Sequence, residues 1–181
     1  YLLPDTLTLQ DGALVEPMAV AVQAVKEGDL RFGDTVAVFG AGPIGLLTII
    51  AAKAAGASKV IALDLSESRL EKAKELGATH IINSGKEDPV KAIRAIVPDG
   101  VDVTFEVAGV TQTYIQSIDA TRARGTMVIV SIFARPIEWN PLHLTNTGVK
   151  ITSSIAYSPT SFQQTVDLMG TGQLKPQGII T

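Results

Sequence analysis

One glycine-rich turn between a strand and a helix constrains the fold of this chain more than any other feature. The apolar, β-prone run 36–39 breaks into Gly-Ala-Gly-Pro-Ile-Gly at residues 40–45, and an apolar helix-forming stretch follows. The pattern G-x-G-x-x-G is informative only in this setting, where a strand ends and a helix begins. It predicts the first crossover of a doubly wound α/β domain, with a loop that receives a phosphate group.

The positions of this turn have separate physical reasons. Gly40 allows the tight turn, Gly42 lacks the Cβ that would keep a pyrophosphate away from the backbone, and Gly45 lets the helix lie close to its strand. Pro43 falls near the first helical position, where a missing N–H costs nothing. The unpaired amides of the first turn and the helix dipole then face an anion. The predicted contacts of a dinucleotide pyrophosphate are Gly40, Gly42, Pro43, Ile44 and Gly45.

A second strand, residues 59–64, ends in an acid. Asp64 follows Gly45 at close to the spacing of about 20 residues that dinucleotide-binding sequences show. A carboxylate there can accept hydrogen bonds from both hydroxyls of an adenosine ribose, and it repels a 2′-phosphate. The predicted cofactor is therefore NAD rather than NADP. The alternative is that Asp64 caps a helix or forms a turn, since Ser66 and Glu67 follow.

Strands alternate with helices along the rest of the chain, which predicts a single α/β domain with a doubly wound, six-stranded parallel Rossmann sheet in the order 3-2-1-4-5-6. In that order the ligand lies across the ends of the first and fourth strands. Ala108 and Gly109 then border the cofactor, and the end of the fifth strand, residues 130–132, borders its nicotinamide half. The predicted strands span 36–39, 59–64, 79–83, 101–107, 126–132 and 150–157, and predicted helices span 17–26, 43–55, 66–76, 89–97, 111–120 and 161–169.

Composition narrows the class of protein. The 181 residues are 46% apolar and 18% charged, as in a globular domain, and the net charge of −3 gives no electrostatic case for nucleic acid or an anionic membrane. The absence of cysteine excludes disulfides and thiolate metal sites. The longest apolar run, around 44–52, is too short for a membrane span, and no leader is evident. We expect a cytoplasmic protein and, because the first residue is Tyr1, a piece of a longer one.

Taken together, several segments resemble the medium-chain zinc-dependent alcohol/polyol dehydrogenases, in particular the 2,3-butanediol and sorbitol dehydrogenase branch. The resemblance covers essentially the whole chain. The segments that carry it are 12–20 (G-A-L-V-E-P-M-A-V), 32–38 (F-G-D-T-V-A-V), 40–45, 64–70 (D-L-S-E-S-R-L), 73–78 (A-K-E-L-G-A), 102–109 (D-V-T-F-E-V-A-G) and 172–181.

The resemblance implies a two-domain enzyme that oxidises secondary alcohols or reduces ketones with NAD. Members hold a catalytic zinc on Cys and His ligands in a GroES-like domain, which this chain lacks. Residues 1–28 would then lead from that missing domain, and residues 29–181 would form the NAD-binding domain. The chain has no cysteine, and only His80 and His143, far apart in sequence, so we expect no zinc site within it and no turnover by it alone.

The same resemblance implies roles for individual residues. Glu16, in the Glu-Pro motif, would lie by the zinc of the full-length protein, as a ligand or a partner of its water. The alternative is a carboxylate favoured by a helix that starts at Pro17, with Glu16 itself extended or capping. Arg69 would pack on the adenine or reach its ribose, or it is a solvated helix charge. The backbone expected at the nicotinamide side is Val107, Ala108 and Gly109 together with Val130, Ser131 and Ile132, unless these simply pack at strand ends.

Family members also pair their cofactor domains through the outermost strand. Segment 150–157 is the candidate edge for such a homo-oligomer, because it is β-prone and lacks the prolines or multiple charges that protect an edge. Two other functions remain open: a stand-alone, non-catalytic NAD-binding regulatory module, and a fragment of a zinc-free quinone or enone reductase. Asp64 argues against the reductase, since many of those enzymes prefer NADPH.

Overall fold

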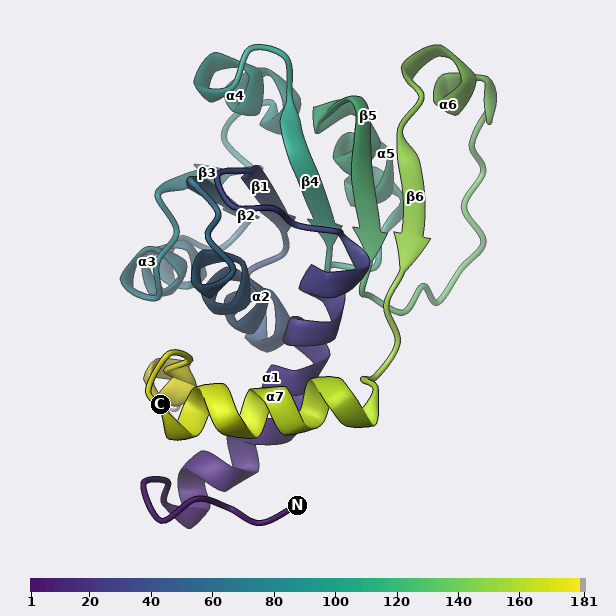
Figure 1. Cartoon of the computed structure of the whole chain (residues 1–181). Coiled ribbons are helices and arrows are strands. Elements are labelled where there is room, and N and C mark those ends of the chain that lie inside the picture. Colours follow the sequence, from purple (N-terminus) through teal and green to yellow (C-terminus); the bar gives the residue numbers. More distant parts are fainter. Residues whose placement is uncertain (180–181) are drawn as a thin grey trace.

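Six parallel strands form one sheet in the order β3-β2-β1-β4-β5-β6 in the computed structural model, which describes residues 1–179 (Figure 1). The strands are β1 (Thr35–Phe39), β2 (Lys59–Asp64), β3 (His80–Asn83), β4 (Val101–Glu106), β5 (Thr121–Ile129) and β6 (Lys150–Ser153). The helices are α1 (Leu9–Glu27), α2 (Pro43–Ala54), α3 (Glu67–Glu75), α4 (Pro89–Ile96), α5 (Thr111–Ala120), α6 (Leu142–Thr147) and α7 (Pro159–Gly170), followed by a 3₁₀ turn, η1 (Pro176–Ile179). This confirms the predicted fold and strand order.

Helices cover both faces of the sheet, so successive residues of a central strand enter different cores. In β1, Val36 and Val38 join a cluster with residues of α1 and α2, whereas Ala37 and Phe39 join a cluster that includes Ile93 of α4. Each fully buried large side chain of this kind contributes about 1.5–3 kcal/mol. The central strands are therefore largely apolar, as expected for a parallel sheet buried on both faces.

Helix α1 begins eight residues earlier than the start predicted at Pro17. A capping box sets its start: the Thr8 hydroxyl accepts the Asp11 amide at 3.1 Å, and the Asp11 carboxylate accepts the Thr8 amide at 2.9 Å. Pro17 lies inside the helix, where it removes one backbone hydrogen bond. The expectation that Glu16 is extended or capping was wrong, because Glu16 lies mid-helix. The dipole explanation of Glu16 loses its basis, since that effect is confined to the first turn.

The bounds of β5 and β6 also differ from the prediction. β5 begins at Thr121, with a register irregularity opposite residues 101–103, and it ends at Ile129 rather than Ile132. β6 ends at Ser153 rather than at residue 157, and Ala156 has a φ of 52°, which no strand residue adopts. The stretch between these strands, expected to be irregular, contains the short helix α6. Of the resembling segment 172–181, residues 180 and 181 lie outside the described part.

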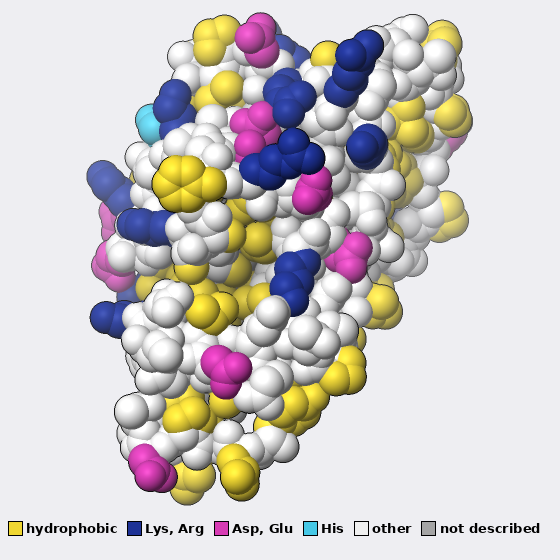
Figure 2. All heavy atoms as spheres, viewed as in Figure 1, with side chains coloured by type: hydrophobic (Ala, Val, Ile, Leu, Met, Phe, Trp, Pro, Cys, Tyr) yellow, Lys and Arg dark blue, Asp and Glu magenta, His cyan; other side chains and the backbone are white. Residues whose placement is uncertain are grey.

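The carboxyl ends of β4, β5 and β6 point toward the region where α7 crosses α1 (Figure 1). Figure 2 shows acidic and basic side chains interspersed over this face of the molecule. In residues 1–179, no helix combines the length and the apolar character needed to cross a membrane.

Candidate functional site

The candidate site lies at the carboxyl ends of β1 and β4, where the strand order reverses. Hydrogen bonds tie the start of each following loop to the neighbouring strand. After β4, the Val107 amide donates to the Phe39 carbonyl at the end of β1 at 2.9 Å. After β1, the Gly40 amide donates to the Leu63 carbonyl of β2 at 2.8 Å. In open α/β sheets, the crevice at such a switch point is where ligands bind.

The three glycines of the loop have the local environments that the sequence predicts for them. Gly40 has a φ of +106°, and a Cβ there would lie 3.2 Å from the Ala108 nitrogen. A Cβ on Gly45 would lie 1.9 Å from the Gly40 carbonyl oxygen, so α2 rests directly on the turn. A Cβ on Gly42 would meet nothing within 4 Å, and no side chain caps α2 at this residue. The helix N-terminus therefore opens onto free space, which fits an anion.

Asp64 joins the glycine loop to the start of α3. One carboxylate oxygen accepts the Ala41 amide at 2.8 Å, and the other accepts the Ser66 amide at 2.9 Å. The Asp64 side chain is 9% exposed, and the Arg69 guanidinium lies 3.8 Å from it. A carboxylate has about four lone-pair sites, so each oxygen keeps capacity for a further donor such as a ribose hydroxyl. Asp64 thus forms the turn that was considered as an alternative and also faces the candidate site.

A pocket of ≈ 260 Å³ begins at Asp64 and Arg69 and extends to α5. Its wall includes residues that sequence reasoning missed: Leu65, Ser84, Val110, Gln112, Thr113 and Gln116. Leu65 and Val110 are large apolar residues that are 73% and 50% exposed. Leu65 directly follows the carboxyl end of β2, and Val110 comes four residues after the end of β4 and just before α5, so their positions after these strands could have identified them. A pocket with exposed apolar side chains in its wall and polar groups beside them suits a flat heteroaromatic ring.

The two segments expected at the nicotinamide side lie against each other. A Cβ on Gly109 would lie 2.8 Å from the Ile132 carbonyl oxygen. Glu106 links the segments: its main-chain oxygen accepts the Val130 and Ser131 amides, and its carboxylate accepts the Ser131 hydroxyl. The structure therefore brings residues 107–109 and 130–132 together at the same edge of the sheet.

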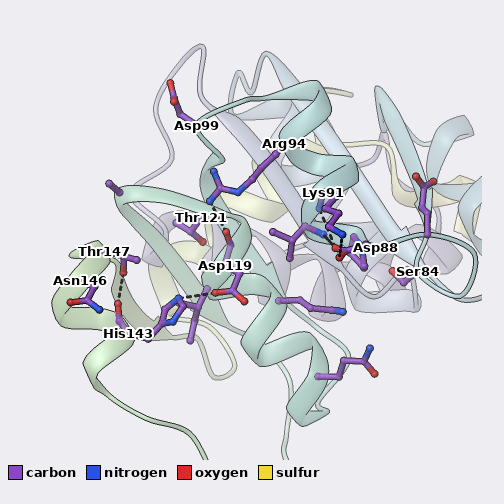
Figure 3. Close-up of a pocket in the computed structure, with 17 residues that line it drawn as sticks. Ser84, Asp88, Lys91, Arg94, Asp99, Asp119, Thr121, His143, Asn146 and Thr147 are labelled. Carbon is purple, nitrogen blue, oxygen red and sulfur yellow. Dashed lines mark hydrogen bonds and ion pairs between the residues drawn. The ribbon is translucent and has the colours of Figure 1, made fainter.

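A second, larger hollow of ≈ 950 Å³ lies between α4, α5 and α6 (Figure 3). Several of its charged groups are paired. His143 lies 2.7 Å from Asp119, Arg94 donates to two backbone carbonyls, and Lys91 lies 3.8 Å from Asp88. Glu87 and Asp99, which flank α4, also line this hollow.

The histidines make local contacts. The His80 ring nitrogen Nδ1 lies 2.9 Å from the Thr79 hydroxyl, and His143 pairs with Asp119. Within residues 1–179, no three His, Cys, Asp or Glu side chains are grouped so that they could hold a metal ion.

Glu16 is exposed on α1, and its partner is Tyr157, which lies between β6 and α7. Burial raises the pKa of Tyr157, and the Glu16 carboxylate beside its hydroxyl raises it further. Tyr157 was not predicted as a site residue, because nothing in the spacing of residues 16 and 157 indicates their contact.

An all-parallel doubly wound sheet with a glycine turn at its switch point defines a dinucleotide-binding domain of the NAD(P) type. A family model described as "Zinc-binding dehydrogenase" matches residues 43–171. The chain is 42% identical over 181 residues to (R,R)-butanediol dehydrogenase of Bacillus subtilis (strain 168), a match that covers 100% of this chain and 52% of that protein. It is 36% identical over 184 residues to sorbitol dehydrogenase of Rattus norvegicus, with 100% and 51% covered. The chain belongs to the zinc-binding dehydrogenase family, as its cofactor domain, and spans about half the length of these relatives.

Solved structures agree with this assignment. The crystal structure of 2R,3R-butanediol dehydrogenase from Bacillus subtilis matches with a TM-score of 0.94 at 42% identity, over 100% of this chain and 52% of that one. A zinc-binding dehydrogenase from Sinorhizobium meliloti 1021, bound to NADP, matches with a TM-score of 0.92 at 34% identity, over 97% and 52%.

Proposed function

We propose that this chain is the NAD-binding domain of a zinc-dependent dehydrogenase that interconverts a secondary alcohol, diol or polyol and its ketone by hydride transfer. The observation that carries the proposal is the open N-terminus of α2 at Gly42, next to the pocket that Asp64 lines. The match of the whole chain to about half of proteins named butanediol and sorbitol dehydrogenases supports the reaction and the substrate class.

The preference for NAD over NADP rests on Asp64. Its carboxylate is largely buried, and the only cation beside it in the described residues is the exposed Arg69 side chain at 3.8 Å. A 2′-phosphate placed at this carboxylate would meet a like charge, which costs several kcal/mol. The relative that is bound to NADP shows that this fold also accommodates the phosphorylated cofactor, so the choice depends on individual residues.

The contribution of this chain to the reaction is binding and orientation. The nicotinamide supplies the hydride when the cofactor is bound. The chain's own residues hold the phosphates at Gly42, the ribose at Asp64 and the reactive end at residues 107–109 and 130–132, which keeps one ring face toward the substrate.

A zinc ion does not fit the described residues by themselves, because zinc needs three or four clustered ligands and residues 1–179 contain no group of three. We propose Glu16 as a zinc-proximal residue only in a longer protein, where residues 1–28 would connect to the domain that supplies the other ligands. Tyr157, which faces Glu16, would then lie at the same place.

Glu16→Gln in the complete enzyme is expected to lower turnover or zinc content, measured by steady-state kinetics and metal analysis. Unchanged values for both would refute this role.

Calorimetric titration of the chain with NAD⁺ and NADP⁺, with metal analysis of the same sample, tests the proposed function. We expect NAD⁺ to bind at least about tenfold more tightly than NADP⁺, because of the like charge at Asp64. Asp64→Asn is the matched variant and is expected to reduce the ratio of NAD⁺ affinity to NADP⁺ affinity. The chain alone should turn over no secondary alcohol. Binding of neither nucleotide would refute the proposal, and tighter binding of NADP⁺ would refute the role of Asp64.

We also propose that the protein pairs with a second copy through segment 150–157. β6 is an outer strand of the sheet, and it carries neither proline nor more than one charged residue. Continuing a sheet across a two-fold axis would satisfy the backbone groups on its free side.

A further inference from the structure

Glu106 is the only acidic or basic residue that is buried in the part of the chain the structure describes, and its exposed fraction is 0%. It ends β4, one of the two strands at the switch point. Burying a carboxylate is costly unless it is paired and hydrogen-bonded. The contacts of this side chain therefore need an explanation.

Four donors surround the carboxylate, and none of them is a cation. One oxygen, Oε1, accepts the Ala108 amide at 3.0 Å, the Gly109 amide at 2.9 Å and the Thr113 hydroxyl at 2.7 Å. The other oxygen, Oε2, accepts the Ser131 hydroxyl. No Lys, Arg or His of the described residues lies within ion-pair distance of Glu106. All four donors are neutral groups, so no positive charge of the described residues offsets the carboxylate.

Three of the four donors belong to the segments that are proposed to hold the nicotinamide. Glu106 therefore positions both segments at once. A neutral glutamine of the same shape could make nearly the same contacts, because its carbonyl would accept three of the donors and its amide could donate to the Ser131 hydroxyl. The geometry alone does not require a charge at this position.

The two redox states of the cofactor differ in charge at the same place. The oxidised nicotinamide ring is a pyridinium cation, and the reduced ring is neutral. A fixed anion in a low-dielectric wall next to this ring distinguishes the two forms. We infer that Glu106 is a positioning residue whose uncompensated carboxylate makes the site bind NAD⁺ more tightly, relative to NADH, than an uncharged wall would. This inference rests on the proposed function and adds a redox preference to it.

The test compares Glu106→Gln, which removes the charge and keeps the shape, with Ser131→Ala, which removes one donor and keeps the charge. The affinities for NAD⁺ and for NADH are measured by calorimetry, and the unfolding midpoint of each variant is recorded. Glu106→Gln is expected to lose about tenfold in NAD⁺ affinity relative to NADH affinity. Ser131→Ala is expected to change both affinities by a similar factor. A similar change in both affinities for Glu106→Gln would overturn the inference.

A second variant covers the case in which Glu106→Gln does not fold. Thr113→Lys replaces the hydroxyl that donates to Glu106 by a longer side chain with an ammonium group, and so it adds a positive charge at the pocket wall without removing the carboxylate. The NAD⁺ to NADH affinity ratio should fall in this variant as well, and an unchanged ratio would overturn the inference. Wild-type protein that binds neither form would refute the proposed function, and the inference with it. Wild-type binding together with an unchanged ratio in the variants would refute the inference alone.

Discussion

Two glycines three residues apart in the turn that enters α2 are required for different reasons. At Gly45 a side chain has no room, because its Cβ would lie 1.9 Å from the Gly40 carbonyl oxygen. A Cβ on Gly42 would meet nothing within 4 Å, and the backbone there has an ordinary φ of −69°. Gly45 is therefore needed for folding, and Gly42 is needed to leave space for the proposed ligand.

Alanine substitutions separate these two needs. Gly45→Ala is expected to lower the free energy of unfolding by at least about 1–3 kcal/mol, as overpacking against backbone does. Gly42→Ala is expected to change stability by no more than about 1 kcal/mol, the scale of an N-cap effect. Its methyl group should nevertheless weaken NAD⁺ binding by about tenfold, since it projects into the anion site. Urea denaturation and calorimetry measure the two quantities. Gly42→Ala protein that binds NAD⁺ as tightly as wild type would contradict this view of the loop.

At the scale of residues, the sequence indicated the groups whose chemistry depends on local spacing. The glycine turn and Asp64 are of this kind, because the turn, the strand and the acid all lie within one βαβ unit. Gln112 was missed, since its place in the pocket depends on how α5 packs against the sheet. The contacts of Glu106 were also missed, because its partner Ser131 follows the end of a different strand, β5.

At the scale of elements, strands β1 to β4 and the starts of α2, α3, α4, α5 and α7 were predicted to within about two residues, whereas α1, β5 and β6 were misplaced. A central buried strand such as β1 is apolar throughout and is bounded by glycine or charge. The start of α1 was misplaced because Pro17 was taken as a start signal, whereas the Thr8–Asp11 capping box begins the helix. The end of β6 was misplaced because residues 154–157 are β-prone in composition, while Ala156 adopts a positive φ.

The amino ends of β1, β4 and β5 are joined by Asp102. One of its carboxylate oxygens accepts the Thr35 amide and hydroxyl, each at 2.8 Å, and the other accepts Arg122 at 2.6 Å. Burial by itself would raise the pKa of Asp102, but the hydrogen bonds from Thr35 and the hydrogen bond and charge of Arg122 outweigh it. The pKa is lowered from 3.8. This carboxylate therefore stabilises the fold in its ionised form.

Asp102→Asn should reveal that contribution through its pH dependence. A lowered folded-state pKa adds stability that is complete above the unfolded pKa and is lost as the pH falls through the folded pKa. We expect Asp102→Asn to be less stable than wild type by about 1.5–3 kcal/mol at pH 7, the scale of hydrogen bonds to a charged group. The difference should shrink as the pH falls below 3.8. Urea denaturation at several pH values measures it, with Asp99→Asn, at an exposed position, as the control. A difference that stays constant with pH would contradict the linkage.

At the scale of the whole molecule, the sheet leaves two outer strands, β3 and β6. Ser154 donates its amide to the Ile129 carbonyl at 2.8 Å, so the strand alternation turns the Ser153 and Ile151 amides away from β5. These amides lie on the free side of β6. They are the groups that a second copy of the chain would pair with, if the sheet continues as we propose.

Ser153→Pro tests this pairing without breaking the link to β5. Ser153 is exposed, and a proline on the free side of an outer strand removes only the outward donor. We expect the variant to keep NAD⁺ binding and its unfolding midpoint, while its sedimentation mass falls to that of a monomer. Ser153→Ala, which keeps the amide, should sediment as wild type does. A proline variant with the wild-type mass would show that the copies do not associate through β6, because a continuous sheet needs that N–H and has no room for the pyrrolidine ring in its place.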